Sequence, residues 1–407
     1  MLSGQSAIAA AGQASASLVE HLRGLAQQRP DDIWLTVAAV QDGRVVERSH
    51  SYGEFDRRVR ALAARLQQLC PVGARALVMM DNDEHYAASM LACFYAGVIA
   101  VPVPPLESLR VQHLERLLGI VGDADAACVI STAEVMQALP GADARFAGIA
   151  AVAADQVDLA DADAWRPHAP AADDIAFLQY TSGSTSAPKG VMVSHGNLIA
   201  NEAAIQQRMD IGVGDRFMSW APLYHDMGLI GGLLQPLYSG LPLVLTSPRL
   251  FLESPVRWLE LISRHRATIS GGPDFAYRMC LERIKPSQLA QLDLSSWRLA
   301  YTGAEPVRAD TVTAFAQRFA ACGLRPDAAY ACYGLAEATL FITGGSCGAG
   351  AAITSFDTEA LGQGRAEESP GASQTTALVG CGPAGTGPAV GLVDPPSLQV
   401  RAPGRGG

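Results

Sequence analysis

The sequence lacks the features that mark nucleic-acid-binding, secreted and zinc-binding proteins. It has 30 Lys and Arg against 40 Asp and Glu residues, a net charge of −10, and no run of basic residues. Because nucleic-acid phosphates bind through clustered positive charge, no nucleic-acid partner is expected. The first residues, Met1–Ser17, contain neither a basic residue nor a leucine-rich core. A secretory signal peptide is therefore not expected.

The cysteines are scattered along the sequence rather than closely spaced in pairs. No two of the eight cysteines form the Cys-x-x-Cys pattern of a zinc site or redox pair. We expect reduced, mostly buried thiols in a cytoplasmic protein. The cysteines are Cys70, Cys93, Cys128, Cys280, Cys322, Cys332, Cys347 and Cys381.

Long uninterrupted hydrophobic segments are also missing. Two stretches without charge, Tyr86–Leu106 and Met227–Pro248, are each broken by several Gly and Pro residues. A membrane-spanning helix needs about 20 continuous residues. Each stretch is therefore predicted to form a helix, a turn and a buried strand, and no membrane span is expected.

The chain does have ample material for a core. Its 407 residues are 49% hydrophobic and only 17% charged, which favours two or three folded units. Ser51 and Glu54 predict a capping box at the start of a helix. An apolar stripe at helical spacing follows it, formed by Phe55, Val59, Leu62, Leu66 and Leu69. A later helix is expected to begin at Leu198 with Asn197 as its cap.

Predicted strands alternate with predicted helices over most of the chain. Strands separated by helices of this length indicate an α/β fold with parallel sheets covered on both faces. We expect one α/β subdomain over residues 1–170 and a second over residues 171–344. Residues 345–376 are rich in Gly, Ala, Ser and Thr and are interpreted as an insertion or linker, and residues 377–407 as the start of a β-rich subdomain.

One segment carries a clear chemical signal, and it follows an apolar run, Ile175–Tyr180. It reads Tyr180-Thr-Ser-Gly-Ser-Thr-Ser-Ala-Pro-Lys-Gly190. Hydroxyl groups and free backbone N–H groups donate to phosphate oxygens, and glycine allows close approach of the backbone. Lysine adds a positive charge for the outer phosphates. The segment is not a Walker loop, because Pro188 precedes and Gly190 follows the lysine; a Ser/Gly-rich surface turn is the alternative.

This segment resembles the phosphate loop of the adenylate-forming superfamily, which includes acyl-CoA synthetases, peptide-synthetase adenylation domains and luciferases. Three further segments resemble motifs of that superfamily, in the same order along the chain. They are Trp220-Ala-Pro-Leu-Tyr-His-Asp-Met-Gly-Leu229, Tyr301-Thr-Gly-Ala-Glu-Pro306 and Tyr330-Ala-Cys-Tyr-Gly-Leu-Ala-Glu-Ala-Thr339. The resemblance extends from about Leu18 to Val400.

The resemblance implies a fold and a set of site residues. The fold is the large N-terminal domain of these enzymes, with two parallel-type β-sheets flanked by helices and a smaller β-rich subdomain. ATP and Mg²⁺ are the implied cofactors. His225, Glu337 and Lys189 are the implied catalytic residues, and Glu337 and Thr185 the implied metal ligands. The implied ATP-binding residues are Thr181, Ser182, Gly183, Ser184, Thr185, Lys189, Gly303, Ala304, Glu305, Cys332, Tyr333, Gly334, Leu335 and Ala336.

Three features favour the fatty acyl-AMP ligases within this superfamily. They are Ser186 in place of the usual glycine, the amino-acid sequence of Gly334–Phe341, and the long stretch after Thr343. Such enzymes join a fatty acid to ATP and pass the acyl group to an acyl carrier protein domain of a polyketide or peptide synthetase. An acyl-CoA synthetase and a non-catalytic nucleotide- or acyl-adenylate-binding module are the alternatives.

Two departures from the family pattern stand out. The turn Met80–His85 replaces a less charged, usually Pro-containing turn and is expected to lie away from the matched motifs. Family members also continue into a small C-terminal domain with a lysine that contacts the reacting groups, and its motifs are not found here. We therefore expect a chain that binds ATP and fatty acid but is slow or inactive in adenylation.

Overall fold

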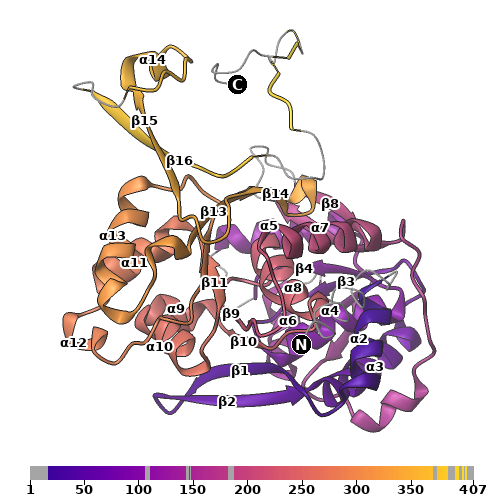
Figure 1. The fold of residues 1–407 in the computed structure, drawn as a ribbon. Helices are drawn as coiled ribbons and strands as arrows, with labels where there is room; N and C mark the ends of the chain where they lie inside the picture. The colour runs from indigo at the N-terminus through magenta and orange to yellow at the C-terminus, as the bar shows by residue number, and fades with distance from the viewer. Residues whose placement is uncertain are drawn as a thin grey trace. The chain divides into compact units, whose positions relative to one another are not determined.

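The computed structural model covers a chain that divides into two compact units (Figure 1). Residues 1–206 and 211–254 form the first unit, and residues 207–210 and 255–407 form the second. The structure describes residues 17–105, 111–143, 146, 148–181, 188–369, 374–383, 390–393, 397 and 399–400. The boundary expected near Ala171 lies inside the first unit and stays a prediction about finer subdivision.

The first unit alternates helices and strands as the sequence predicts. Its helices are α2 (Leu18–Gln28), α3 (Tyr52–Leu69), α4 (Glu84–Ala96), α5 (Val111–Asp123), α6 (Ala133–Ala142), η3 (Leu159–Ala164), α7 (His195–Arg208), the π-helix η4 (Met227–Leu234), α8 (Gln235–Tyr238) and α9 (Pro248–Glu253). Its strands are β1 (Ile33–Gln41), β2 (Arg44–Ser51), β3 (Arg75–Val78), β4 (Ile99–Pro102), β5 (Cys128–Ser131), β6 (Ala150–Ala153), β7 (Ile175–Thr181), β8 (Lys189–Ser194), β9 (Phe217–Ser219) and β10 (Leu243–Thr246).

The second unit continues the same rhythm. Its helices are α10 (Val256–His265), α11 (Asp274–Arg283), α12 (Pro286–Leu289), α13 (Ala309–Phe319), η5 (Ala320–Cys322), η6 (Pro326–Ala328), η7 (Ala336–Ala338) and α14 (Thr358–Gly362). Its strands are β11 (Ile269–Gly272), β12 (Leu299–Thr302), β13 (Ala329–Gly334), β14 (Phe341–Gly344), β15 (Ala352–Asp357) and β16 (Thr375–Gly380). The α/β fold class expected from the sequence is confirmed.

The sheets are parallel in their interior and antiparallel at one edge. In the six-stranded sheet of the first unit, ordered β6-β5-β3-β4-β7-β8, all neighbours are parallel except β7 and β8. The run β9-β10-β1 ends in antiparallel β2, and the run β11-β12-β13 of the second unit ends in antiparallel β14. Each antiparallel strand directly follows its partner, and the connection is too short for a parallel crossover. The parallel-type sheets expected from the sequence thus carry an antiparallel strand at one edge.

The predicted helix ends are partly confirmed. Ser51 and Glu54 form the capping box at α3, and the first four members of its apolar stripe are buried. Helix α7 instead begins at His195, since Ser194 and Asn197 exchange side-chain-to-backbone hydrogen bonds of 3.1 Å, which places the cap at Ser194. The assignment of Asn197 as the cap was wrong by three residues.

Each unit has its own core. Helices α2, α3 and α4 pack together in the first unit (Figure 1). Strands β3, β4 and β5 contribute Leu77, Val101 and Val129 to an apolar cluster with α5. The core of the second unit contains an aromatic cluster in which the Trp258 ring lies 5.4 Å from Tyr277 and 5.3 Å from Trp297, measured between ring centroids. Such edge-to-face contacts stabilise a core beyond the area they bury.

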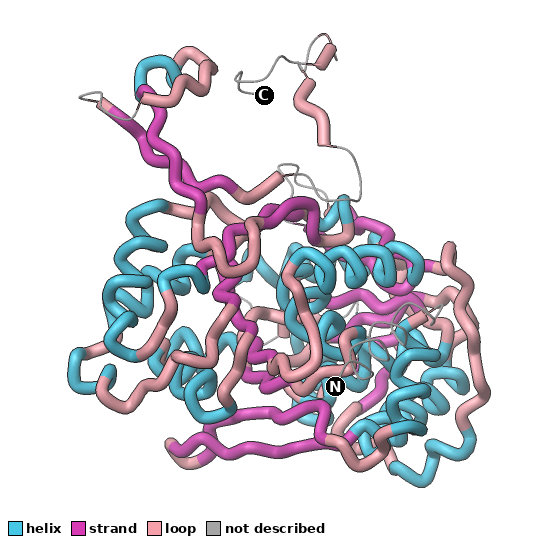
Figure 2. The backbone as a smooth tube through the Cα atoms, in the orientation of Figure 1, coloured by secondary structure: helices cyan, strands magenta, loops and turns pink. Residues whose placement is uncertain are grey.

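The stretch interpreted as an insertion contains regular structure. Strands β15 and β16 pair in an antiparallel hairpin over Ala352–Gly380, with α14 following β15 (Figure 2). Neither strand shows a strong apolar pattern, which explains why the sequence did not predict them. Among the described residues no helix is long and apolar enough to cross a membrane, and both uncharged stretches form short helices and strands as expected.

Candidate active site

The predicted phosphate loop connects the two strands of an antiparallel pair. In this pair Thr181, the last residue of β7, lies opposite Lys189, the first residue of β8. The Lys189 side chain is exposed at the start of β8, just after the loop. The predicted ligands Ser182, Gly183, Ser184 and Thr185 lie outside the described residues. The described strands therefore bring Thr181 and Lys189 together.

Helix α5 holds both ends of this loop. Arg116 donates from Nη2 to the carbonyl oxygen of Thr181 at 2.7 Å. The phenol of Tyr180 donates to a carboxylate oxygen of Asp123 at 2.6 Å. Burial is the larger cause and the hydrogen bond to Asp123 the second cause of a raised pKa of Tyr180, so the phenol keeps its proton. On the returning side, Gly119 faces Pro188, where a Cβ on Gly119 would lie 3.0 Å from Pro188 Cγ.

Gln179 joins the loop strand to the segment that carries His225. Its side chain is 2% exposed, and Nε2 donates to the carbonyl oxygen of Tyr224 at 2.9 Å. A glutamine in the middle of an apolar strand is costly to bury unless its amide is bonded. The backbone beside His225 is therefore tied directly to β7, two residues before Thr181.

The His225 imidazole is exposed at the surface of the first unit, but the surrounding protein still shifts its pKa. Its ring centroid is 4.8 Å from that of Tyr224. Desolvation lowers the pKa of His225; the neighbouring Asp226 raises this pKa, and the Arg116 cation lowers it further. The ring is therefore neutral at pH 7, and a neutral imidazole donates one hydrogen bond and accepts another.

His225 directly precedes an unusual helix. Asp226 Oδ1 accepts a hydrogen bond from Met227 N at 2.7 Å, and η4 over Met227–Leu234 is wound as a π-helix. In this helix Gly228 lies so close to the Pro222 carbonyl group that no side chain fits. Such π-helical turns occur frequently at functional sites.

In the second unit, the turn after β12 lies beside β13. A Cβ on Gly303 would lie 2.7 Å from the carbonyl oxygen of Cys332, so only glycine fits this approach. Ala304 follows with a φ of +65°, a backbone conformation that residues other than Gly and Asn rarely adopt. Glu305 accepts a hydrogen bond from Phe275 N at 2.7 Å. The structure thus brings the predicted residues Gly303 and Cys332 into contact.

Tyr333 presents its ring to solvent. The side chain is 52% exposed on β13, between Cys332 and Gly334. Burial raises the pKa of the Cys332 thiol to about 12, so the sulfur is uncharged and offers no nucleophile. An open aromatic face beside glycine is suited to stacking on a flat base.

Leu335, Ala336 and Glu337 lie in a tight connection between β13 and β14. Leu335 N donates to Leu340 O at 2.9 Å, and Leu340 N donates to Ala338 O at 2.9 Å. The second bond closes a γ-turn at Thr339, whose φ of +71° and ψ of −64° are rare outside glycine. Residues held in such strained conformations cluster at functional sites.

Glu337 has an exposed carboxylate at this connection, with no hydrogen bond or ion pair to the described residues. The part of the chain that the structure describes holds no group of three metal-binding side chains. Mg²⁺ commonly uses one or two carboxylates and completes its shell with phosphate oxygens and water. A single free carboxylate therefore fits Mg²⁺ that arrives with a nucleotide.

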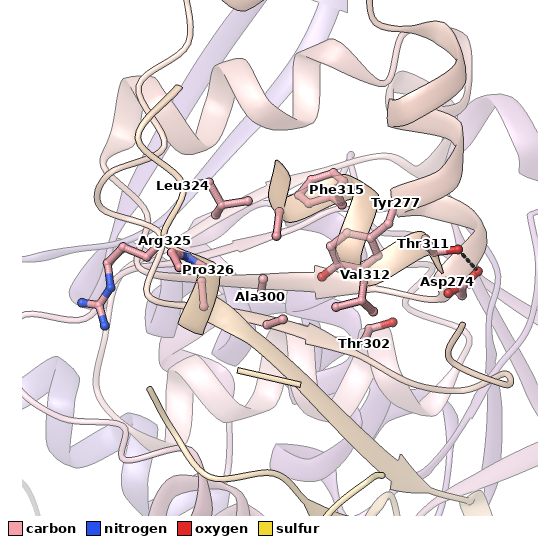
Figure 3. Close-up of a pocket in the computed structure, with 13 residues that line it drawn as sticks. Asp274, Tyr277, Ala300, Thr302, Thr311, Val312, Phe315, Leu324, Arg325 and Pro326 are labelled. Carbon is pink, nitrogen blue, oxygen red and sulfur yellow. Dashed lines mark hydrogen bonds between the residues drawn. The ribbon is translucent and has the colours of Figure 1, made fainter. Parts of the chain in front are cut away.

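A small pocket in the second unit is lined in part by Thr302, the residue before Gly303 (Figure 3). Its volume is about 20 Å³, enough for a water molecule but not for a purine. Asp274 accepts a hydrogen bond from the Thr311 hydroxyl at 3.1 Å at one end, and Phe315 and Leu324 line the rest (Figure 3). This pocket is not a nucleotide site.

The predicted residues therefore form two groups, one in each unit. Thr181, Lys189 and His225 belong to the first, and Gly303, Ala304, Glu305, Cys332, Tyr333, Gly334, Leu335, Ala336 and Glu337 to the second. Arg116, Asp123 and Gln179 were not predicted from the sequence as residues of the site. Only Gln179 offered a signal, as a polar residue inside an apolar strand.

Comparison with known proteins agrees with the motifs. The family model described as AMP-binding enzyme matches residues 23–407. The medium-chain-fatty-acid–[acyl-carrier-protein] ligase JamA of Moorena producens is 39% identical over 89% of this chain and 63% of its own length. The corresponding ligase TtuA of Teredinibacter turnerae is 33% identical over 93% of this chain and 65% of its own length. The chain thus spans a little under two thirds of these relatives.

Solved structures agree with the fold. A fatty acid AMP ligase from Legionella pneumophila superposes with a TM-score of 0.90 at 35% identity, covering 97% of this chain and 68% of that protein. A fatty acyl-adenylate ligase from L. pneumophila, in complex with acyl adenylate and pyrophosphate, superposes with a TM-score of 0.89 at 36% identity and the same coverage.

Proposed function

From the premise that this chain belongs to the AMP-binding enzyme family, among its fatty acyl-AMP ligases, we propose that it activates a fatty acid with ATP. The products are an acyl-adenylate and diphosphate. The acyl group is then passed to an acyl carrier protein domain of a polyketide or peptide synthetase. The names of the ligases JamA and TtuA support a medium-chain fatty acid and a carrier protein as substrates.

One observation carries this proposal. Gln179 ties the strand before the phosphate loop to the backbone beside His225, within a chain that matches the family over 23–407. Activation of a carboxylate requires the triphosphate and the acid to meet at fixed positions. A loop strand and a histidine segment joined by a buried hydrogen bond supply that fixed geometry.

The chemistry requires two anions to approach each other. An oxygen of the fatty acid carboxylate attacks the α-phosphorus, a new P–O bond forms, and the bond to the β-phosphate oxygen breaks as diphosphate leaves. No side-chain nucleophile takes part, so the protein contributes positioning and electrostatic stabilisation. The positive charge of Lys189, together with Thr181 and the loop that they flank, would hold the departing phosphates.

The neutral state of His225 suits its assigned position. A neutral imidazole donates a hydrogen bond to an oxygen of the acid or the α-phosphate without adding a charge that would trap the acid. Desolvation and Arg116 both favour this state by lowering the pKa of His225. His225 would therefore orient the reacting oxygens rather than transfer a proton.

The second unit would hold the nucleoside end. Tyr333 would stack on the adenine, and the turn Gly303–Glu305 would frame its edge. Glu337 would hold Mg²⁺, which neutralises phosphate charge when it is bound. The thiol of Cys332, neutral at pH 7, would serve only as a packing group.

The decisive experiment is incubation of the full chain with MgATP and a series of fatty acids from about six to sixteen carbons. We expect pyrophosphate to be released, at the low rate that the sequence predicts for this chain, and an acyl-adenylate to be detectable by mass spectrometry. The variant His225→Ala should lower the rate of pyrophosphate release while retaining ATP binding. A folded chain that neither binds ATP by calorimetry nor releases pyrophosphate would refute the function.

A second measurement separates the acceptors. The acyl-adenylate is offered either a phosphopantetheine-bearing acyl carrier protein or coenzyme A, and thioester formation is followed. We expect the carrier protein to be acylated in preference. Equal or faster formation of acyl-CoA would assign the chain to the acyl-CoA synthetases. ATP binding without any acyl-adenylate would identify a binding module instead.

A further inference from the structure

The turn between β3 and α4 reaches directly into the segment that precedes His225. Asn82 in this turn is 5% exposed, and its side-chain amide makes three hydrogen bonds. Nδ2 donates to the carbonyl oxygens of Ala221 at 2.8 Å and Thr246 at 3.2 Å, and Oδ1 accepts from Leu223 N at 3.0 Å. Both amide hydrogens and the amide oxygen are used. The expectation that this turn lies away from the matched motifs was wrong.

A second side chain from the same region binds the same residue. Tyr86, one helical turn after Asn82, is fully buried, and its hydroxyl donates to the carbonyl oxygen of Leu223 at 2.9 Å. The backbone N–H and C=O groups of Leu223 are thus both held by side chains. Helix α4 begins rigidly here, because Asp83 Oδ1 accepts from the N–H groups of His85 at 2.9 Å and Tyr86 at 2.8 Å.

Gln179 completes the arrangement from β7. Its bond to the Tyr224 carbonyl oxygen means that side chains bind backbone groups of Ala221, Leu223 and Tyr224. We name Asn82, Tyr86 and Gln179 the 221–224 clamp. His225 N itself donates to Pro222 O at 3.1 Å, so the residue after the clamp inherits its position.

Two parts of one sheet, the turn after β3 and Gln179 of β7, contact this segment. Strands β3, β4 and β7 are parallel neighbours, so their carboxyl ends lie at the same edge. The Asn82 turn follows β3, and the predicted phosphate loop follows β7. The clamp therefore fixes the His225 segment against the edge at which the loop begins.

We propose that Asn82 and Tyr86 are positioning residues for His225. They do not touch the substrate; they hold the main chain of residues 221–224 so that the imidazole meets the reacting oxygens. The proposal rests on the adenylation function proposed above, because it gives His225 a reaction in which to act. A displacement of about 1 Å at a reacting group lowers rates by about a hundredfold.

A matched pair of variants tests this proposal. Tyr86 and Tyr95 lie on the same helix, are both fully buried, and each has a hydroxyl that donates one hydrogen bond. The Tyr86 hydroxyl binds the Leu223 carbonyl, whereas the Tyr95 hydroxyl binds Asp56 Oδ1 at 3.0 Å. Each Phe substitution removes one oxygen atom and leaves the ring.

The readout is pyrophosphate release by the full chain with MgATP and a fatty acid. We expect Tyr86→Phe to lower kcat about tenfold and to leave KM for MgATP within about threefold, since the phosphate loop is untouched. Tyr95→Phe should leave kcat unchanged. It should lower the free energy of unfolding by at least as much as Tyr86→Phe does. Asn82→Asp, which sets a carboxylate against two carbonyl oxygens, should lower kcat about a hundredfold.

Hydrogen exchange tests the clamp without reference to activity. We expect the peptide containing Leu223 and His225 to exchange faster in Tyr86→Phe than in the unsubstituted chain, and to be unchanged in Tyr95→Phe. Unchanged exchange in Tyr86→Phe would overturn the clamp. Equal loss of kcat in both tyrosine variants would also overturn it, because general destabilisation would then explain the effect.

Failure of the adenylation function gives a different result. If the unsubstituted chain bound no ATP and released no pyrophosphate, the proposed function and the catalytic meaning of the clamp would both be refuted. The exchange experiment would still report whether Asn82 and Tyr86 immobilise residues 221–224. The two failures are therefore distinguishable.

Discussion

Gly334 and Leu340 meet so closely across the β13–β14 connection that a Cβ on Gly334 would overlap the carbonyl oxygen of Leu340. The same oxygen accepts a hydrogen bond from Leu335 N at 2.9 Å. A side chain at Gly334 would have to push this backbone aside and break the bond. The contact fixes the connection that carries Tyr333 on one side and Glu337 on the other.

Gly334→Ala should therefore be strongly destabilising for so small a change. We expect the free energy of unfolding to fall by about 1–3 kcal/mol, as for other overpacked sites. Urea unfolding measures this loss. Gly122→Ala is the control, because Gly122 lies on α5 and a methyl group there would meet no atom within 4 Å, so alanine should be neutral or stabilising by up to about 1 kcal/mol. Equal stability of the two variants would contradict the overlap.

Glu337→Gln keeps the shape of the side chain and removes its charge. We expect the affinity for ATP in the presence of Mg²⁺ to fall about tenfold, since hydrogen bonds and contacts to charged groups contribute about 1.5–3 kcal/mol. Affinity without Mg²⁺ should change little. Calorimetric titration with and without the metal measures both.

The control is Glu282→Gln, which makes the same chemical change at an exposed position on α11 of the same unit. It should leave both affinities unchanged. If Glu337→Gln retained the full effect of Mg²⁺ on ATP binding, the metal-binding role of Glu337 would be refuted. A parallel loss in both variants would indicate a general effect of charge.

Arg116→Met tests the electrostatic link between α5 and His225. The Arg116 cation lowers the pKa of His225, so its removal should raise that pKa, although desolvation, the larger cause, keeps it below 6.5. The acid limb of the rate of pyrophosphate release should move to higher pH in the variant. Titration of the His225 ring protons by NMR measures the change directly.

Arg57→Met is the matched control for this titration. Arg57 is another exposed arginine that donates to a backbone carbonyl, that of Leu159 at 3.3 Å, and it does not influence the pKa of His225. The variant should leave the titration of His225 in place. A shift of equal size in both variants would show that the field at His225 is set by net charge rather than by Arg116.

Sequence reasoning succeeded where the signal was local. The capping box at Ser51 and the strand before Thr181 each depend on residues within one or two turns of the chain. Capping and apolar periodicity act over such distances, so they can be read without the fold. The order of the superfamily motifs added the site residues by resemblance.

Long-range relationships were not accessible in the same way. Asn82 and Leu223 are separated by 141 positions, and nothing in either segment predicts that they bond. The antiparallel pairing of β1 and β2 did offer a signal that was overlooked. Asp42 and Gly43, with φ of +51° and +76°, form the two-residue turn typical of Asp-Gly hairpins.

His195, the first residue of α7, makes the fold sensitive to acid. Its side chain is buried against the Phe94 ring, with centroids 5.2 Å apart. Burial lowers the pKa of His195 to about 4, an effect that Asp174 opposes and His168 reinforces. In the unfolded chain the His195 imidazole takes up a proton near pH 6.5, whereas in the folded chain it stays neutral until the pH falls to about 4. Stability should therefore fall as the pH decreases through this window.

The expected loss from His195 between pH 7 and pH 4 is on the order of 3 kcal/mol, at about 1.4 kcal/mol per pH unit. His195→Gln should lower stability at pH 7 but flatten this dependence, because glutamine does not titrate. His265→Gln, at a half-buried position on α10, should leave the slope unchanged. Urea unfolding of the three proteins from pH 7 to pH 4 measures the slopes. If all three fell in parallel, the acid sensitivity would have to arise from groups other than the buried imidazole of His195.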